Sequence, residues 1–181
     1  MCPHSCSVGH RVRTMTDTTN NNTTLTYTTT NVCGWMVKYQ PGVWQFCPPL
    51  LDQLTADLQE VVALLPPDIL TCMQTTTLYI NKTFRYPDHD NNILGACCHQ
   101  SSKWLEENHN LGEKESHVEI YDCWSYIQWV STQPAMLLHE MCHALHWRRT
   151  EQLDDLIRKA YDTAMETGKY ERVFHFDRSI R

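Results

Sequence analysis

The sequence has no apolar run that approaches the ~18 residues needed for a membrane-spanning helix, so no association with a membrane is expected. Basic residues form no extended run, and the formal net charge is -6 at pH 7. That balance argues against a nucleic-acid-binding surface. The opening residues, MCPHSCSVGHRVR, lack the apolar centre of a secretory signal peptide. A cytoplasmic location is therefore expected.

The composition is that of one globular domain, with 181 residues, 41% hydrophobic and 20% charged. Nine cysteines are present. Because this number is odd and the cysteines are scattered in a chain without a secretory signal, they are expected to be reduced thiols and not a disulfide framework.

The order of elements predicts an α+β fold. The Thr/Asn-rich residues 14–31 predict that 1–31 form a disordered tail, which leaves 32–181 as the folded domain. β-Branched and aromatic residues predict strands at 32–39, 75–84 and 116–122. Helical spacing of apolar residues predicts helices at 50–65, 134–148 and 152–167, with a short helix within 101–112. Residues 85–96 are expected to form a loop.

The helix predicted at 134–148 contains the pattern His-Glu-x-x-His, formed by His139, Glu140 and His143. Residues four apart on a helix differ by ~40° around the axis and ~6 Å along it, so both imidazoles can reach one metal ion. Glu140 is rotated by ~100° from His139 and can hold a water molecule beside the ion. Zinc lowers the pKa of a coordinated water, and such a glutamate can accept its proton.

The remaining residues of this helix are mostly apolar, namely Met136, Leu137, Leu138, Met141, Cys142 and Leu145. The helix is therefore expected to be buried. Burying two histidines and a glutamate is unfavourable unless something binds them, which favours a metal site. The alternative is a pair of core histidines whose hydrogen bonds are satisfied by the protein.

Longer segments resemble a family of zincin-type metallopeptidases, mostly uncharacterised bacterial and algal proteins. The segments that carry the resemblance are GW, LLPPDIL, ACCHQSSKWLEEN, HVEI, QPAMLLHEMCHALH and IRKAYDTAMETGKYERV, spread over residues 33 to 174. The resemblance implies a zincin-like domain with a small sheet, His139 and His143 as zinc ligands, and Glu140 as the general base. In zincins a strand lines the substrate cleft, and HVEIYD is the expected strand here.

The third zinc ligand is left open by the sequence. Family members continue to a segment similar to Glu-Tyr-Phe-Ala-Glu that should supply it, so the chain is expected to be truncated before this segment. Within the chain, Asp154 follows His143 by a spacing similar to that of aspartate-type zincins. His146 shares the face of the two ligands but lies ~10 Å along the helix from His139. A cleft role beside the metal is expected for His146. Glu166 is expected to face solvent.

The sequence therefore predicts zinc-dependent hydrolysis of peptide or protein substrates, with Zn²⁺ as the cofactor and Glu140 as the proton acceptor. A metal-binding pseudoenzyme or inactive fragment is one alternative, and a non-catalytic scaffold domain is another. Cys97, Cys98 and His99 are expected to be structural, because no Cys-x-x-Cys pair accompanies them. Tyr170 is expected to pack at the end of the last helix.

Overall fold

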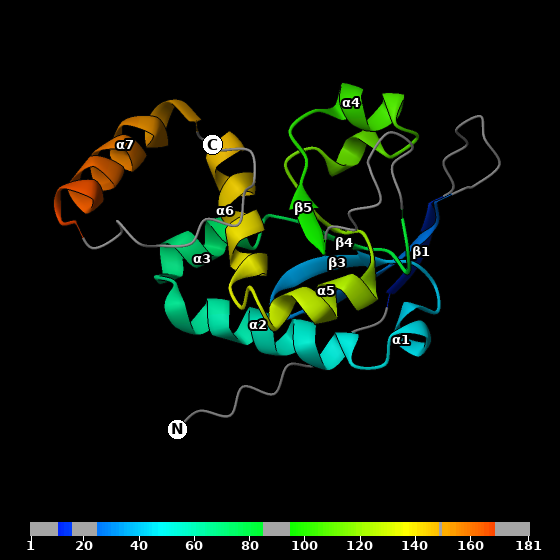
Figure 1. Ribbon diagram of the computed structural model, residues 1–181. Coiled ribbons are helices and arrows are strands. Elements are labelled where there is room, and N and C mark those ends of the chain that lie inside the picture. Colours follow the sequence, from blue (N-terminus) through cyan, green and yellow to red (C-terminus); the bar gives the residue numbers. More distant parts are fainter. Residues whose placement is uncertain (1–10, 16–24, 85–94, 149, 169–181) are drawn as a thin grey trace. The chain divides into compact units, whose positions relative to one another are not determined.

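The computed structural model describes residues 11–15, 25–84, 95–148 and 150–168 (Figure 1). It consists of two compact units, Met1–Trp147 and Arg148–Arg181. The domain predicted at 32–181 is thus divided between them. Most of the predicted loop at 85–96, and also Tyr170, lie outside the described residues.

The first unit is built on a mixed six-stranded sheet with the strand order β1-β2-β3-β4-β6-β5. β3, β4 and β6 are parallel to one another, whereas β1–β2, β2–β3 and β5–β6 are antiparallel pairs. The strands are β1 Arg11–Met15, β2 Tyr27–Val32, β3 Trp35–Tyr39, β4 Leu78–Ile80, β5 Ala96–Cys98 and β6 Val118–Ile120. With the helices below, the sheet confirms the α+β class.

Two of these strands fall in the predicted disordered tail, and that prediction is wrong for residues 11–15 and 27–31. β2 pairs with the whole of β3, from Thr28 opposite Tyr39 to Val32 opposite Trp35. The connecting turn is Cys33-Gly34, both with positive φ, as expected of a tight two-residue hairpin. Threonine is β-branched and suits a strand. A Thr-rich composition is therefore compatible with a strand as well as with disorder, and here it forms a hairpin.

The helices are α1 Val43–Phe46, α2 Leu50–Leu64, α3 Pro67–Met73, α4 Ser102–Glu107, the 3-10 helix η1 Gly112–Lys114, α5 Cys123–Val130, α6 Met136–Arg148 and α7 Thr150–Glu166. The helices predicted at 50–65, 134–148 and 152–167 are confirmed as α2, α6 and α7. Asp122 caps α5, because its side chain accepts a hydrogen bond from the Ser125 amide. Among the described residues, no helix has the length and apolar character needed to cross a membrane.

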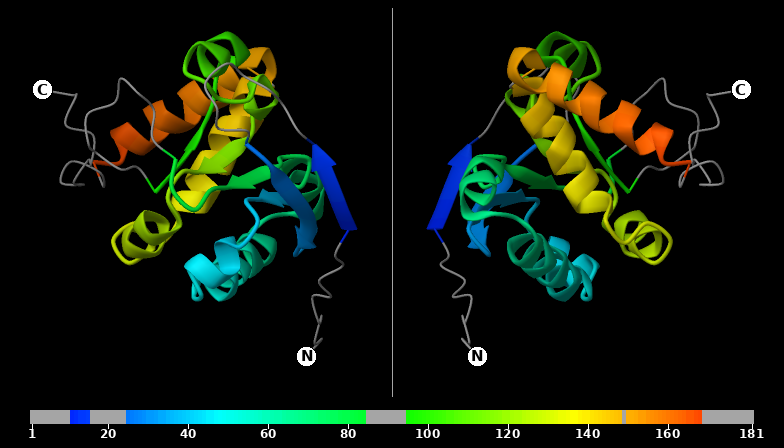
Figure 2. Two further views of the ribbon diagram at one scale, coloured as in Figure 1. Left: turned by 90° about the vertical axis from the view of Figure 1, so that its right-hand side faces the viewer. Right: turned by 90° about the vertical axis from the view of Figure 1, so that its left-hand side faces the viewer.

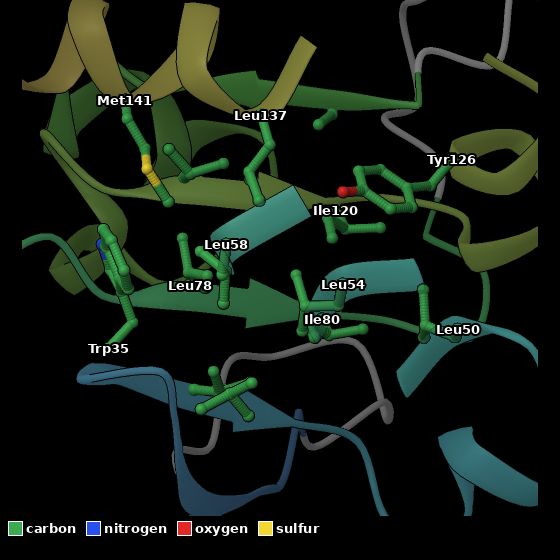
Figure 3. Close-up of a cluster of buried hydrophobic side chains, with 14 of the residues drawn as sticks. Trp35, Leu50, Leu54, Leu58, Leu78, Ile80, Ile120, Tyr126, Leu137 and Met141 are labelled. Carbon is green, nitrogen blue, oxygen red and sulfur yellow. The ribbon is translucent and has the colours of Figure 1, made fainter. Parts of the chain in front are cut away.

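One face of the sheet forms the main hydrophobic core with α2, α5 and α6. α2 and α5 lie side by side (Figure 2), joined by a hydrogen bond from the Tyr126 hydroxyl to Asp57. Figure 3 shows Leu137 and Met141 pointing from α6 toward the sheet, and both are buried. These contacts fix α6 against the sheet.

The opposite face of the sheet combines a small hydrophobic cluster around Tyr27 and Tyr79 with buried polar groups, and the segment of α4 and η1 contacts it. Because side chains alternate along a strand, Tyr79 and Glu119 point away from the main core. Asn110 and Lys114 of the covering segment both hydrogen-bond to Glu119. Glu119 and Lys114 are each 0% exposed, so this face contains a fully buried ion pair.

Candidate metal and hydrolytic site

α6 brings the two predicted metal ligands together. The Nε2 atoms of His139 and His143 are 3.0 Å apart, and the ring centroids are separated by 4.6 Å at an interplanar angle of 85°. Both imidazoles come from successive turns of one helix face, as the His-Glu-x-x-His spacing predicts. The two Nε2 atoms lie within hydrogen-bond distance of each other.

The surroundings of the histidines differ from the expectation of a fully buried helix. His139 is exposed and His143 is half-buried. The face of α6 toward the core is formed instead by Met136, Leu137, Met141 and Ala144. The helix is thus apolar toward the sheet and open on the histidine side, because α6 lies at the border of the core. An open histidine side gives a metal ion or substrate access.

His143 is held in a defined orientation by Trp147, whose ring stacks on the imidazole with centroids 5.3 Å apart and planes 15° apart. Burial lowers the pKa of His143, and the neighbouring His139 and His146 lower it further. A neutral imidazole is the form that binds metals. The environment of His143 therefore favours the metal-binding form near neutral pH.

Glu140 contacts the edge strand of the sheet. Its Oε2 atom accepts a hydrogen bond of 2.8 Å from the backbone amide of Cys98 in β5. Burial raises the pKa of the Glu140 carboxyl to about 7, against the opposing effect of the Cys98 hydrogen bond. A carboxyl with a pKa near the working pH suits proton transfer in both directions.

The strand that contacts Glu140 is the edge strand β5, whereas HVEIYD was the strand expected beside the active helix. β6, which contains Val118–Ile120 of that segment, is paired on one side with β4 and on the other with β5. β5 is the edge strand. A strand of three residues has too little periodicity to be detected from sequence, so the amide of Cys98 was not expected at the site.

The two histidines can be tested against the geometry of zinc. Two nitrogens that each lie ~2.1 Å from one tetrahedral zinc ion are ~3.4 Å apart. The Nε2 atoms are 3.0 Å apart, within hydrogen-bond distance of each other, so the two rings must separate slightly to bind one ion. Histidine nitrogens are among the donors that zinc prefers. The pair therefore supplies two donors that suit zinc.

A third ligand does not join this pair in the part of the chain that the structure describes. Within these residues, no group of three or more His, Cys, Asp or Glu side chains is arranged to hold a metal ion. His146 influences His143 electrostatically but does not complete such a group. Asp154 lies on α7 in the second unit and is exposed, as is Glu166, which was predicted to face solvent.

Comparison of the chain with protein-family models, with curated proteins and with solved structures found no match.

Proposed function

We propose that the protein is a zinc-dependent hydrolase of peptide bonds. The observation that carries the proposal is the arrangement on α6, where the Nε2 atoms of His139 and His143 converge at 3.0 Å. On the same helix, Glu140 reaches the edge strand of the sheet at the Cys98 amide. A pair of histidines and a carboxyl group on one helix, beside the edge strand of a sheet, support this proposal. The resemblance to zincin-type metallopeptidases supports the same chemistry.

The roles of the residues follow from their chemistry. His139 and His143 would hold a zinc ion through their ring nitrogens. Such an ion would supply Lewis acidity toward a carbonyl group and lower the pKa of a water molecule. Glu140 would accept a proton from the attacking water and return it to the leaving amine, a role that suits a carboxyl with a pKa of about 7.

An extended peptide is the substrate that the edge strand favours. β5 is paired with β6 on one side, and its other edge faces the Glu140 carboxylate at Cys98. A peptide that adds to such an edge makes backbone hydrogen bonds that do not depend on its sequence. Its carbonyl groups would then pass close to Glu140 and the histidine pair.

The third zinc ligand is part of the proposal to be tested. Replacing His146 with Ala is expected to leave one equivalent of zinc bound, because His146 does not join the histidine pair in a three-ligand group within the described residues. Asp154, which belongs to the second unit, is tested in the same way by Asp154→Asn. Loss of bound zinc in one variant alone would identify that residue as the third ligand.

A metal-binding domain without hydrolytic activity is the second candidate. It is favoured by the histidine pair standing without a third ligand in the described part of the chain, because catalytic zinc has three protein ligands and one open position.

A fluorogenic peptide-library assay with the full chain separates the two candidates. Hydrolysis that is abolished by a chelator and restored by zinc supports the hydrolase. Zinc binding without any hydrolysis supports the non-catalytic domain, and absence of both zinc binding and hydrolysis refutes both proposals.

A further inference from the structure

The edge strand that contacts Glu140 has two different faces. Ala96 and Cys98 belong to the main hydrophobic core. Cys97, between them, lies opposite Glu119 of β6, and its thiol contacts the Tyr121 hydroxyl on the polar face. β5 comprises only three residues, so few backbone hydrogen bonds hold it. Its pairing with β6 is continued by His99, whose carbonyl accepts a 2.8 Å hydrogen bond from the Ser116 amide.

The main anchor of the polar face is the carboxylate of Glu119. Its Oε1 atom accepts hydrogen bonds from Lys114 Nζ and from Asn81 Nδ2, the latter at 2.5 Å. Its Oε2 atom accepts from Asn110 Nδ2 at 3.0 Å and from His99 Nε2 at 2.6 Å. Each oxygen thus has two donors, and the carboxylate is 0% exposed. Such a network has little freedom to move.

His99 connects this network to the edge strand. It follows Cys98 directly, and its backbone amide donates to the His117 carbonyl at 3.4 Å. Its ring stacks on Trp104 of α4, with centroids 6.0 Å apart and planes 26° apart. The His99 side chain is 4% exposed. His99, the residue directly after Cys98, is therefore fixed on the face of the sheet opposite the main core.

We propose that the buried His99–Glu119 pair is a positioning device for the general base: it fixes the end of β5, whose Cys98 amide holds the Glu140 carboxylate. The inference rests on the proposed function for its catalytic consequence. The anchoring of β5 itself does not depend on that function. Neither His99 nor Glu119 touches the substrate in this scheme, and both act through the backbone of Cys98.

Three variants test the role of His99. His99→Phe keeps a ring for stacking on Trp104 but removes the donor to Glu119. His99→Gln keeps a nitrogen donor at a similar distance from the backbone. His117→Phe is the matched control, because the His117 side chain bonds to Thr77 and not to Glu119. Its Nδ1 atom accepts a 3.0 Å hydrogen bond from the Thr77 amide, and only its backbone carbonyl, which the substitution keeps, bonds to His99.

In the zinc-loaded protein, His99→Phe is expected to lower kcat by about tenfold with little change in KM, as for a misplaced catalytic group. Amide hydrogen exchange at Cys98 should become about tenfold faster, while zinc stoichiometry stays unchanged because α6 is held by other contacts. His99→Gln should restore kcat and the exchange rate to within about twofold of the parent protein. His117→Phe should change neither.

Unchanged kcat and unchanged Cys98 exchange in His99→Phe would overturn the inference, as would equal changes in His117→Phe, which would indicate a general loss of structure. If the parent protein hydrolyses no peptide, the proposed function fails. Faster Cys98 exchange confined to His99→Phe and reversed in His99→Gln would still support the anchoring in that case.

Discussion

The Nε2 atoms of His139 and His143 face each other across 3.0 Å on the open side of α6. The residues are one helical turn apart, and Trp147 stacks on the second ring and limits its rotation. Two imidazole nitrogens this close on one helix face can serve as two ligands of one metal ion. The two histidines are therefore expected to bind a zinc ion.

About one equivalent of zinc per chain should be found by elemental analysis of protein purified without added metal. His139→Ala and His143→Ala should each abolish this binding, because each removes one of two converging ligands. The exposed His109, which has positive φ, offers a control as His109→Asn. Unchanged zinc content in either variant would contradict the assignment of His139 and His143 as zinc ligands.

Glu140→Gln should retain the zinc and lose hydrolysis by roughly 100-fold or more, the effect expected for a lost general base. Glutamine cannot accept the proton but preserves the size of the side chain and an oxygen for the Cys98 amide. Initial rates on one fluorogenic peptide, measured beside bound zinc, check this. The exposed Glu107 provides the control Glu107→Gln. Activity that survives Glu140→Gln would refute the mechanism.

The buried Glu119 should make the protein less stable in acid. Burial alone would raise the pKa of Glu119, but Lys114 and His99 outweigh burial and lower it from 4.5 to about 2. A carboxyl with a depressed pKa in the folded state contributes stability that is present above pH ~4.5 and is lost as the pH falls toward ~2. The loss should amount to about 3 kcal/mol at most.

Urea unfolding at a series of pH values between 5 and 2 measures this contribution. In Glu119→Gln, the free energy of unfolding should be lower at pH 5 and should fall less steeply with acid, because the titrating group is gone. An identical pH dependence in the parent and variant proteins would show that Glu119 is not the group responsible.

The core between α2 and the sheet should be sensitive to cavity formation. Leu54 and Leu58 are both 0% exposed, so Leu54→Ala or Leu58→Ala should reduce the free energy of unfolding by about 2–5 kcal/mol. Leu156 on α7 is 63% exposed, and Leu156→Ala should cost less than about 0.5 kcal/mol. Denaturant unfolding of the three variants checks the contrast. Equal losses at Leu54 and Leu156 would contradict the assigned core.

Much of the candidate site was predictable because it is local in sequence. The apolar spacing of α2, α6 and α7 defines helices without reference to the rest of the chain. On a helix, the interval between His139 and His143 alone places both imidazoles on one face. The side of α6 that faces the core was less predictable, because apolar residues occur almost all around the helix.

Only the tertiary structure decided which backbone lies beside Glu140. The Cys98 amide comes from a three-residue edge strand 42 residues earlier in the chain, and no local pattern marks that strand. The same holds for the Thr-rich strand Tyr27–Val32, which is ordered by pairing with β3. It also holds for Glu119, whose carboxylate is buried among four hydrogen-bond donors from Asn81, His99, Asn110 and Lys114. Helical spacing is a property of neighbouring residues, whereas strand pairing and the burial of charge depend on partners that only the folded chain brings together.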